Sequence, residues 1–164
     1  MALRDIVPFR PPVFGIPGTT TYNVSPSATV INAGEFVLKT DGSGGNVVTA
    51  FQTNKPVIGT DYIAGLAVTS SNQTTTVSGT IEVMEISPNM IFLANPKVAA
   101  TWATQTLYDA LVGYRVLLDV TSSVTTILAA NGAINGCVVR ELDITKYPGK
   151  VAFSLVAPVI SGYK

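Results

Sequence analysis

The residues that carry most enzyme chemistry are scarce in this chain of 164 residues. It contains no histidine, so a Ser-His-Asp relay cannot form. Lysine could replace histidine as a base, but the lysines lie in polar or turn contexts that do not favour it. The single cysteine, Cys137, lies in the apolar run Gly136-Cys-Val-Val. We expect its thiol to be buried and to act as a small hydrophobe, not as a nucleophile.

The acidic residues do not form a recognisable site either. Glu82 and Glu85 are three positions apart, which on a strand places them on opposite faces. Asp61, Asp109, Asp119 and Asp143 fall at turns or strand ends, without the spacing of a calcium loop. The stretch Asp41-Gly-Ser-Gly-Gly-Asn lacks the Gly-Lys-Ser/Thr ending of a phosphate loop. We therefore predict a protein that is not an enzyme, with no catalytic residue, metal or cofactor.

Composition narrows the choice of partner. Hydrophobic residues make up 47% of the chain and charged residues only 12%, about half the usual fraction. Ten basic residues balance ten acidic ones, so no global field attracts nucleic acid or an anionic membrane. No apolar run approaches the ~18 residues of a membrane span, and no secretory signal is recognisable, so we expect synthesis and folding in the cytoplasm. A surface with few charges suits a protein that a partner will cover.

Residues 1–27 differ from the rest of the chain, and we assign residues 28–164 to one β domain. Five prolines (Pro8, Pro11, Pro12, Pro17, Pro26) predict an extended segment. Its large apolar side chains are too numerous to leave in water, so we predict an arm that lies on a surface. Its own domain and another subunit are both open, and we favour a neighbouring subunit. The predicted partner-binding residues are Ile6, Val7, Phe9, Arg10, Val13, Phe14 and Ile16.

The stretch from Tyr62 to Ile86 predicts the central hairpin of the domain. From Val77 to Val83, the apolar residues and Gly79 alternate with Ser, Thr and Glu, which is the period of a half-buried strand. Ile81 and Val83 should therefore be buried, and Thr80 and Glu82 exposed. The alternation breaks at Met84-Glu85-Ile86, where we expect a β-bulge.

The remaining pattern predicts an all-β fold, a single compact barrel or sandwich-like domain with an N-terminal arm. Short β-type runs are separated by Gly, Asn and Pro turns. One segment, Ala99 to Val112, instead has a helical stripe at Ala103, Leu107, Ala110 and Leu111, followed by Gly113. We expect one short helix there, with Trp102 as its core anchor. The predicted strands, including the two of the hairpin, are 29–31, 35–39, 47–51, 63–69, 77–86, 90–93, 115–120, 124–129, 137–144 and 150–156.

Several features together resemble the small capsid decoration (cement) and auxiliary virion proteins of tailed bacteriophages. They are the proline-rich arm, the segments Tyr62-Ile-Ala-Gly-Leu-Ala-Val-Thr-Ser and Val77-Ser-Gly-Thr-Ile-Glu-Val-Met, the helix-like Leu107-Tyr-Asp-Ala-Leu-Val-Gly, and Asn135-Gly-Cys-Val-Val-Arg. The resemblance implies many copies on the outside of a capsid, bound to the major capsid protein and to neighbouring copies. It implies a location on the virion and brings no catalytic residues with it.

Two other classes of protein stay open. One is a different β-rich virion component, such as a tail-tube or neck protein. The other is a cell-surface or carbohydrate-binding β module, in which Trp102, Tyr108 and Tyr114 would form a stacking platform.

Overall fold

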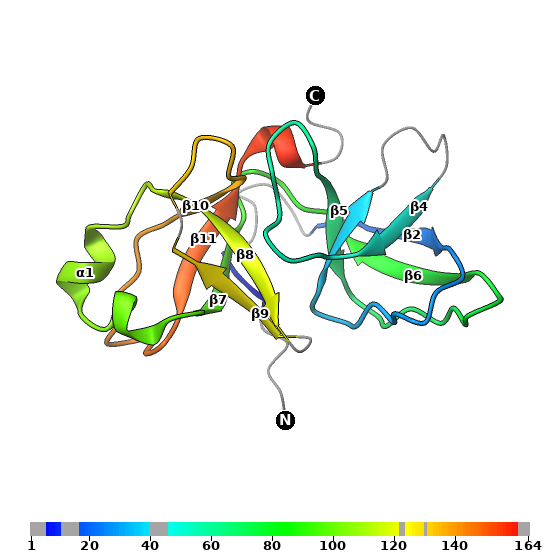
Figure 1. Ribbon diagram of the computed structural model, residues 1–164, viewed down its shortest axis with the longest axis horizontal. Helices are drawn as coiled ribbons and strands as arrows, with labels where there is room; N and C mark the ends of the chain where they lie inside the picture. Colours follow the sequence, from blue (N-terminus) through cyan, green and yellow to red (C-terminus); the bar gives the residue numbers. More distant parts are fainter. Residues whose placement is uncertain (1–5, 11–16, 40–45, 122–123, 130, 161–164) are drawn as a thin grey trace.

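The computed structural model describes residues 6–10, 17–39, 46–121, 124–129 and 131–160. Within these ranges β-strands are the main regular structure, with one short α-helix, which confirms the predicted all-β class. No helix among them is long and apolar enough to cross a membrane. Figure 1 shows an elongated molecule with β2 to β6 at one end and β7 to β11 with α1 at the other.

The first half of the chain forms a closed barrel, which we call barrel 1. Its strands follow one another round the ring in the order β2-β4-β3-β5-β6. All neighbours are antiparallel except β2 and β4, which are parallel. The strands are β2 (Thr19–Val24), β3 (Phe36–Lys39), β4 (Val47–Ala50), β5 (Tyr62–Ala67) and β6 (Gly79–Met84).

The second half forms a second ring, barrel 2. Its sheet has the order β7-β11-β10-β8-β9, and a further parallel pairing of β7 with β9 closes it. The strands are β7 (Ile91–Pro96), β8 (Arg115–Thr121), β9 (Val124–Leu128), β10 (Cys137–Val139) and β11 (Val151–Leu155). The 3₁₀ turn η1 (Ala99–Trp102) and helix α1 (Gln105–Asp109) lie between β7 and β8, and η2 (Ala157–Val159) follows β11. Strand β1 (Val7–Arg10) adds to β7 outside the ring.

The two barrels have the same strand topology. With the strands of each ring numbered in chain order, the first strand pairs in parallel with the third. The third then pairs with the second, the second with the fourth, the fourth with the fifth, and the fifth with the first. The registers also correspond. The parallel pairs Asn23↔Val47 and Val24↔Val48 match Asn95↔Thr126 and Pro96↔Ile127.

The antiparallel pairs agree with this match. Leu66↔Met84 and Ala67↔Val83 of barrel 1 match Val138↔Ser154 and Val139↔Phe153 of barrel 2. The same glycine turn precedes the second strand of each ring, with Gly34 at φ 84° and Gly113 at φ 85°. Their N–H groups donate to equivalent carbonyls, Ala67 at 2.8 Å and Val139 at 3.0 Å. The chain therefore contains an internal structural repeat, in which the same five-stranded topology occurs twice.

The two barrels share a hydrophobic core. The ring of Phe36, from β3, lies 5.1 Å from Phe92 and 6.3 Å from Phe153 of barrel 2, centroid to centroid. On the other face of β3, Val37 faces a separate cluster inside barrel 1 with Val48, Ile81 and Val83. Strands such as β3 are buried on both faces, which explains their continuous apolar sequence.

The predicted hairpin is present, and its register is as expected. Strands β5 and β6 pair, Ile81 and Val83 are buried, and Thr80 and Glu82 are exposed. The bulge is not at Met84-Glu85-Ile86, because β6 ends at Met84 and Glu85 turns outward to accept a hydrogen bond from Thr20. The irregularity lies in β5, where pairing with β3 skips Ala64.

The helix forms where expected, but of the predicted stripe only Leu111, which is half-buried, packs against the core. Ala103, Leu107 and Ala110 are exposed, and Leu107 keeps 46% of its accessible surface. Trp102 and Tyr108 are buried instead, with ring centroids 5.6 Å apart, so Trp102 is the expected anchor. A helix of five residues has little more than one turn, so the two large rings decide which side is buried.

The N-terminal boundary also differs from the prediction. Residues 19–24, placed in the arm, form β2 of barrel 1, and residues 7–10 form β1. Residues 29–31 are not a strand, and the predicted strand 137–144 ends at Val139.

Candidate interaction surfaces

The cysteine is where the sequence places it, in an apolar interior. Cys137 is fully buried in the large apolar cluster that contains residues of both barrels, and desolvation raises the pKa of its thiol well above the ordinary value. A thiol in this setting stays protonated and is not a nucleophile.

The carboxylates of the described residues form no group of three or more acidic or thiol side chains that could hold a metal ion. Several of them are instead paired with lysines. Asp61 lies 2.8 Å from Lys55, Asp119 lies 2.7 Å from Lys97, and Asp143 lies 3.5 Å from Lys146. Glu82 and Glu85 are both exposed, one in β6 and one just after it. Each of these three aspartates therefore has a lysine as its charged partner.

The predicted arm residues lie on the protein's own barrel wherever they are described. Strand β1 pairs with β7 in the register Val7↔Leu93 and Pro8↔Phe92. Ile6, just before β1, is 2% exposed and belongs to the shared core, so its assignment as a partner-binding residue is wrong in this structure.

Phe9 is half-buried, and its ring meets that of Tyr147 edge to face at 4.9 Å. Only the backbone of Val7 and Arg10 is described, as part of β1. Val13, Phe14 and Ile16 lie outside the described residues. Strand β1 is therefore an accessory strand, because barrel 2 closes through β7 and β9 without it.

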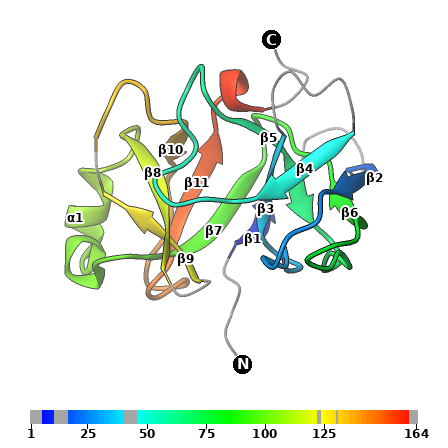
Figure 2. The ribbon, with the colours of Figure 1, turned by 45° about the vertical axis from the view of Figure 1, so that its right-hand side comes forward.

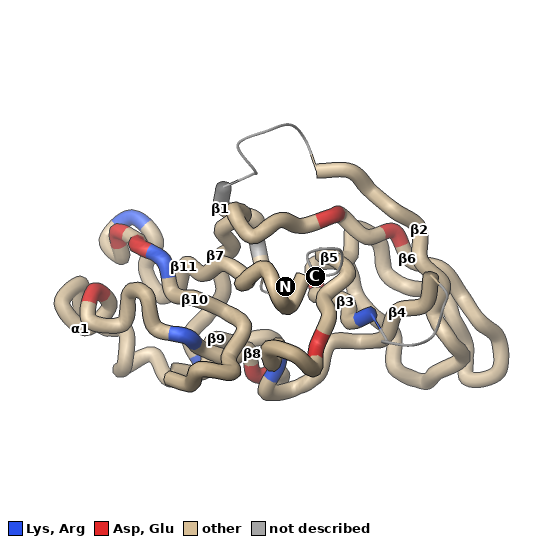
Figure 3. The backbone as a smooth tube through the Cα atoms, turned by 90° about the horizontal axis from the view of Figure 1, so that it is seen from above, with Lys and Arg blue, Asp and Glu red and all other residues tan. Residues whose placement is uncertain are grey.

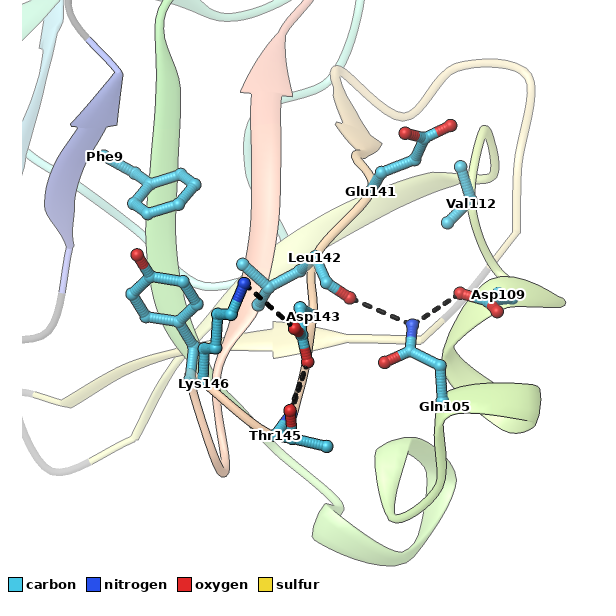
Figure 4. A pocket seen from close by; sticks show the side chains of 10 residues that line it. Phe9, Gln105, Asp109, Val112, Glu141, Leu142, Asp143, Thr145 and Lys146 are labelled. Atoms are coloured by element: carbon cyan, nitrogen blue, oxygen red, sulfur yellow. Dashed lines mark hydrogen bonds and ion pairs between the residues drawn. The ribbon is translucent and has the colours of Figure 1, made fainter.

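An open groove of about 910 Å³ lies beside α1, and Phe9 forms part of its rim. Figure 4 shows Gln105 spanning it, with one amide hydrogen directed to Asp109 and another to the carbonyl of Leu142. Its amide oxygen accepts from the N–H of Ile144. Asp143 is exposed, and hydrogen bonds from Thr145 hold the pKa of its carboxyl below the ordinary value. The polar groups of the groove mainly bond to one another and so hold its walls together.

A different surface forms at the far end of barrel 1, which we call the neutral platform. It consists of residues 25–34, between β2 and β3, and residues 68–80, which lead from β5 into β6. Neither segment contains a charged residue. Figure 2 shows these connections at the end of the molecule opposite α1, and Figure 3 shows the scattered charged residues, with none on these loops.

Side-chain hydrogen bonds fix the two segments to each other. Ser71, which is buried, accepts from the N–H of Ile31 at 2.9 Å, and Gln73 donates to the carbonyl of Thr29 at 2.6 Å. The N–H of Ser27 donates to the carbonyl of Thr74 at 2.9 Å. A Cβ on Gly79 would collide with the backbone nitrogen of Gln73, so only glycine lets this loop close against β6.

The outer side of the neutral platform is made of hydroxyls and valines. Val30 keeps 45% of its surface exposed, Val68 47% and Val77 59%. Thr69, Thr74, Thr75, Thr76 and Ser78 are exposed around them. The sequence pattern placed Val77 on the buried face of a strand, which is wrong because β6 begins two residues later, at Gly79.

The aromatic residues do not form the stacking platform considered for a carbohydrate-binding module. Trp102 is 5% exposed and Tyr108 0%, whereas Tyr114 is 41% exposed. Two of the three rings are therefore core residues, and no sugar could stack on them.

Comparisons of the chain with protein-family models, with curated proteins and with solved structures found no match.

Proposed function

We propose that this chain is a structural protein of a bacteriophage virion, which binds the outside of the capsid and stabilises it. The observation that carries the proposal is the accessory strand β1. Barrel 2 is a closed ring without it, so β1 is an addition that fixes the N-terminal segment to the body. Burial of Ile6 provides a firm anchor for that segment.

This arrangement supports a modified form of the arm. Residues 6–10 are its root, held on the protein's own barrel, and Val13, Phe14 and Ile16 follow in the sequence before β2. These three side chains are our proposed contacts with the major capsid protein. Apolar burial contributes roughly 25 cal/mol per Å², so a few such side chains can supply several kcal/mol of attachment energy.

The low charge of the body supports the same function. Charged residues are 12% of the chain, and three of its lysines are paired with aspartates. A partner can cover a surface of neutral hydroxyls without burying a charge that lacks an opposite charge. Burying such an unpaired charge would cost free energy.

The test is co-sedimentation with empty expanded capsids of the phage that encodes the chain. The full-length protein should bind saturably, and Phe14→Asp and Val13→Asp should weaken binding strongly while melting as the wild type does. Val98→Asp, at a valine that is 55% exposed between β7 and η1, is the matched control and should bind normally. Wild-type protein that does not bind capsids at all would contradict the function. Normal binding by the two arm variants would contradict only the role of the arm.

A tail-tube or neck protein would share the β-rich body and the arm. Cryo-electron microscopy of the native virion separates these alternatives, because a decoration protein must lie over the capsid lattice and not along the tail.

A further inference from the structure

The neutral platform has a chemical property that bears on what can cover it. Its exposed polar groups are mainly the hydroxyls of threonine and serine. A hydroxyl both donates and accepts hydrogen bonds, whereas a carboxylate only accepts and a lysine only donates. A surface of hydroxyls is therefore complementary to a copy of itself, since each group can pair with its own kind.

Charge leads to the same partner. A carboxylate or ammonium group buried under the platform would find no opposite charge in residues 25–34 or 68–80. The opposite end of the molecule carries Asp109, Glu141, Asp143 and Lys146 and does not fit it. Glu35 and Glu82 closely follow the two segments in the sequence and belong to the rim, where charge is tolerated. The Glu35 carboxylate already accepts hydrogen bonds from the backbone N–H and the side-chain amide of Asn32. An uncharged face of a second copy fits the platform, and the platform itself is such a face.

Rigidity and size favour the same contact. The hydrogen bonds that Ser71 and Gln73 make with Ile31 and Thr29 fix the loops before binding, so little conformational entropy remains to be lost. Together the two segments are about as long as the contribution of one partner to a standard interface, roughly 20–30 residues. Val30, Val68 and Val77 supply exposed apolar surface for such a contact.

We propose that the neutral platform is the contact between two copies of this chain, which pair face to face about a twofold axis through residues 25–34 and 68–80. In a twofold contact the same patch faces itself, which is the arrangement that self-complementary hydroxyls allow. This inference concerns contact between copies and does not depend on binding to a capsid.

Sedimentation velocity of the full-length protein over a concentration series tests it. As the protein concentration rises, the sedimenting mass of the wild type should change from that of one chain to twice that mass. Val77→Glu and Val30→Glu each introduce a carboxylate into the uncharged contact, and each should weaken dimerisation about tenfold or more. Ile134→Glu is the matched control, because Ile134 is 62% exposed outside the platform, and it should dimerise as the wild type does. Thermal melts of all three variants, expected to match the wild type, show that folding is intact.

Salt provides a second measurement that needs no variant. A contact without charged groups should be unaffected or slightly strengthened by added sodium chloride, because salt screens only charges. Three results would overturn the proposal: a wild type that stays monomeric at every concentration, a dimer that Val30→Glu and Val77→Glu leave intact, or a dimer that salt dissociates.

Discussion

The hydroxyl of Ser71 bonds to both backbone groups of Ile31. It accepts from the N–H of Ile31 at 2.9 Å and donates to its carbonyl at 3.3 Å. The two residues are forty positions apart and both are buried, so this one side chain links the two segments of the neutral platform. Barrel 2 has a comparable link in Tyr108, whose hydroxyl connects α1 to β11 and to Arg140.

Ser71→Ala should therefore destabilise the protein and loosen the platform. The change leaves the buried N–H of Ile31 without its hydrogen-bond partner, which typically costs about 1–3 kcal/mol of unfolding free energy. Urea unfolding measures the loss. Hydrogen exchange at Ile31 and its neighbours should become faster in the variant. Thr75→Ala, an exposed change in the same loop, should be neutral. Equal stability of the two variants would contradict the role given to Ser71.

The register of β6 allows a second prediction. Ile81 is 2% exposed inside barrel 1, and Ile81→Ala should cost about 2–5 kcal/mol because it leaves a cavity. Thr80 points to solvent, and its structural hydrogen bond uses the backbone N–H, so Thr80→Ala should change stability by less than about 0.5 kcal/mol. Denaturant melts of the two variants make the comparison. Similar losses at both positions would show that the face is assigned wrongly.

The local sequence pattern was sufficient to predict β5 and β6. One face of β6 is exposed to solvent, so the alternation of apolar and polar residues is visible in its sequence. It failed at α1, where the burial of Trp102 and Tyr108 overrides the spacing of smaller residues. The internal repeat was not predicted. Its signals are short, such as Gly34 and Gly113 placed two residues before equivalent strands, and connections of unequal length remove any fixed period. The neutral platform could have been noticed as two charge-free segments, but only the fold brings them together.

The N-terminal strand was missed for a physical reason. Proline lacks an N–H and is excluded from central strands, but an edge strand tolerates it. Pro8 lies in β1, which pairs on one side only among the described strands. Because Ile6 is 2% exposed, Ile6→Ala should cost about 2–4 kcal/mol, and deleting residues 1–10 should lower the melting temperature. Pro8→Ala, at an exposed position, is the control. Unchanged melting of Ile6→Ala would show that β1 is not held in solution as it is in the structure.

Tyr108 provides a prediction for the effect of pH. Burial is the main cause that raises the pKa of its phenol from 10.0 to about 12; the nearby Asp109 raises it further, and the hydrogen bond from Ala152 opposes the shift. Between these two pH values the unfolded protein loses the proton and the folded protein keeps it. The stabilising contribution of Tyr108 is therefore complete below about pH 10 and is lost as pH rises to about 12.

Tyr108→Phe should act in two ways. At neutral pH it leaves the N–H of Ala152 and the carbonyl of Arg140 without the hydroxyl, which should cost about 1–3 kcal/mol. Above pH 10 it removes one ionisation that favours unfolding, so its unfolding free energy should fall less steeply than that of the wild type. Tyr114→Phe, a change in an exposed ring, controls for the loss of a tyrosine in general. Chemical unfolding from pH 7 to pH 12 measures the difference, and parallel curves for wild type and Tyr108→Phe would mean that the phenol of Tyr108 ionises equally well in both states.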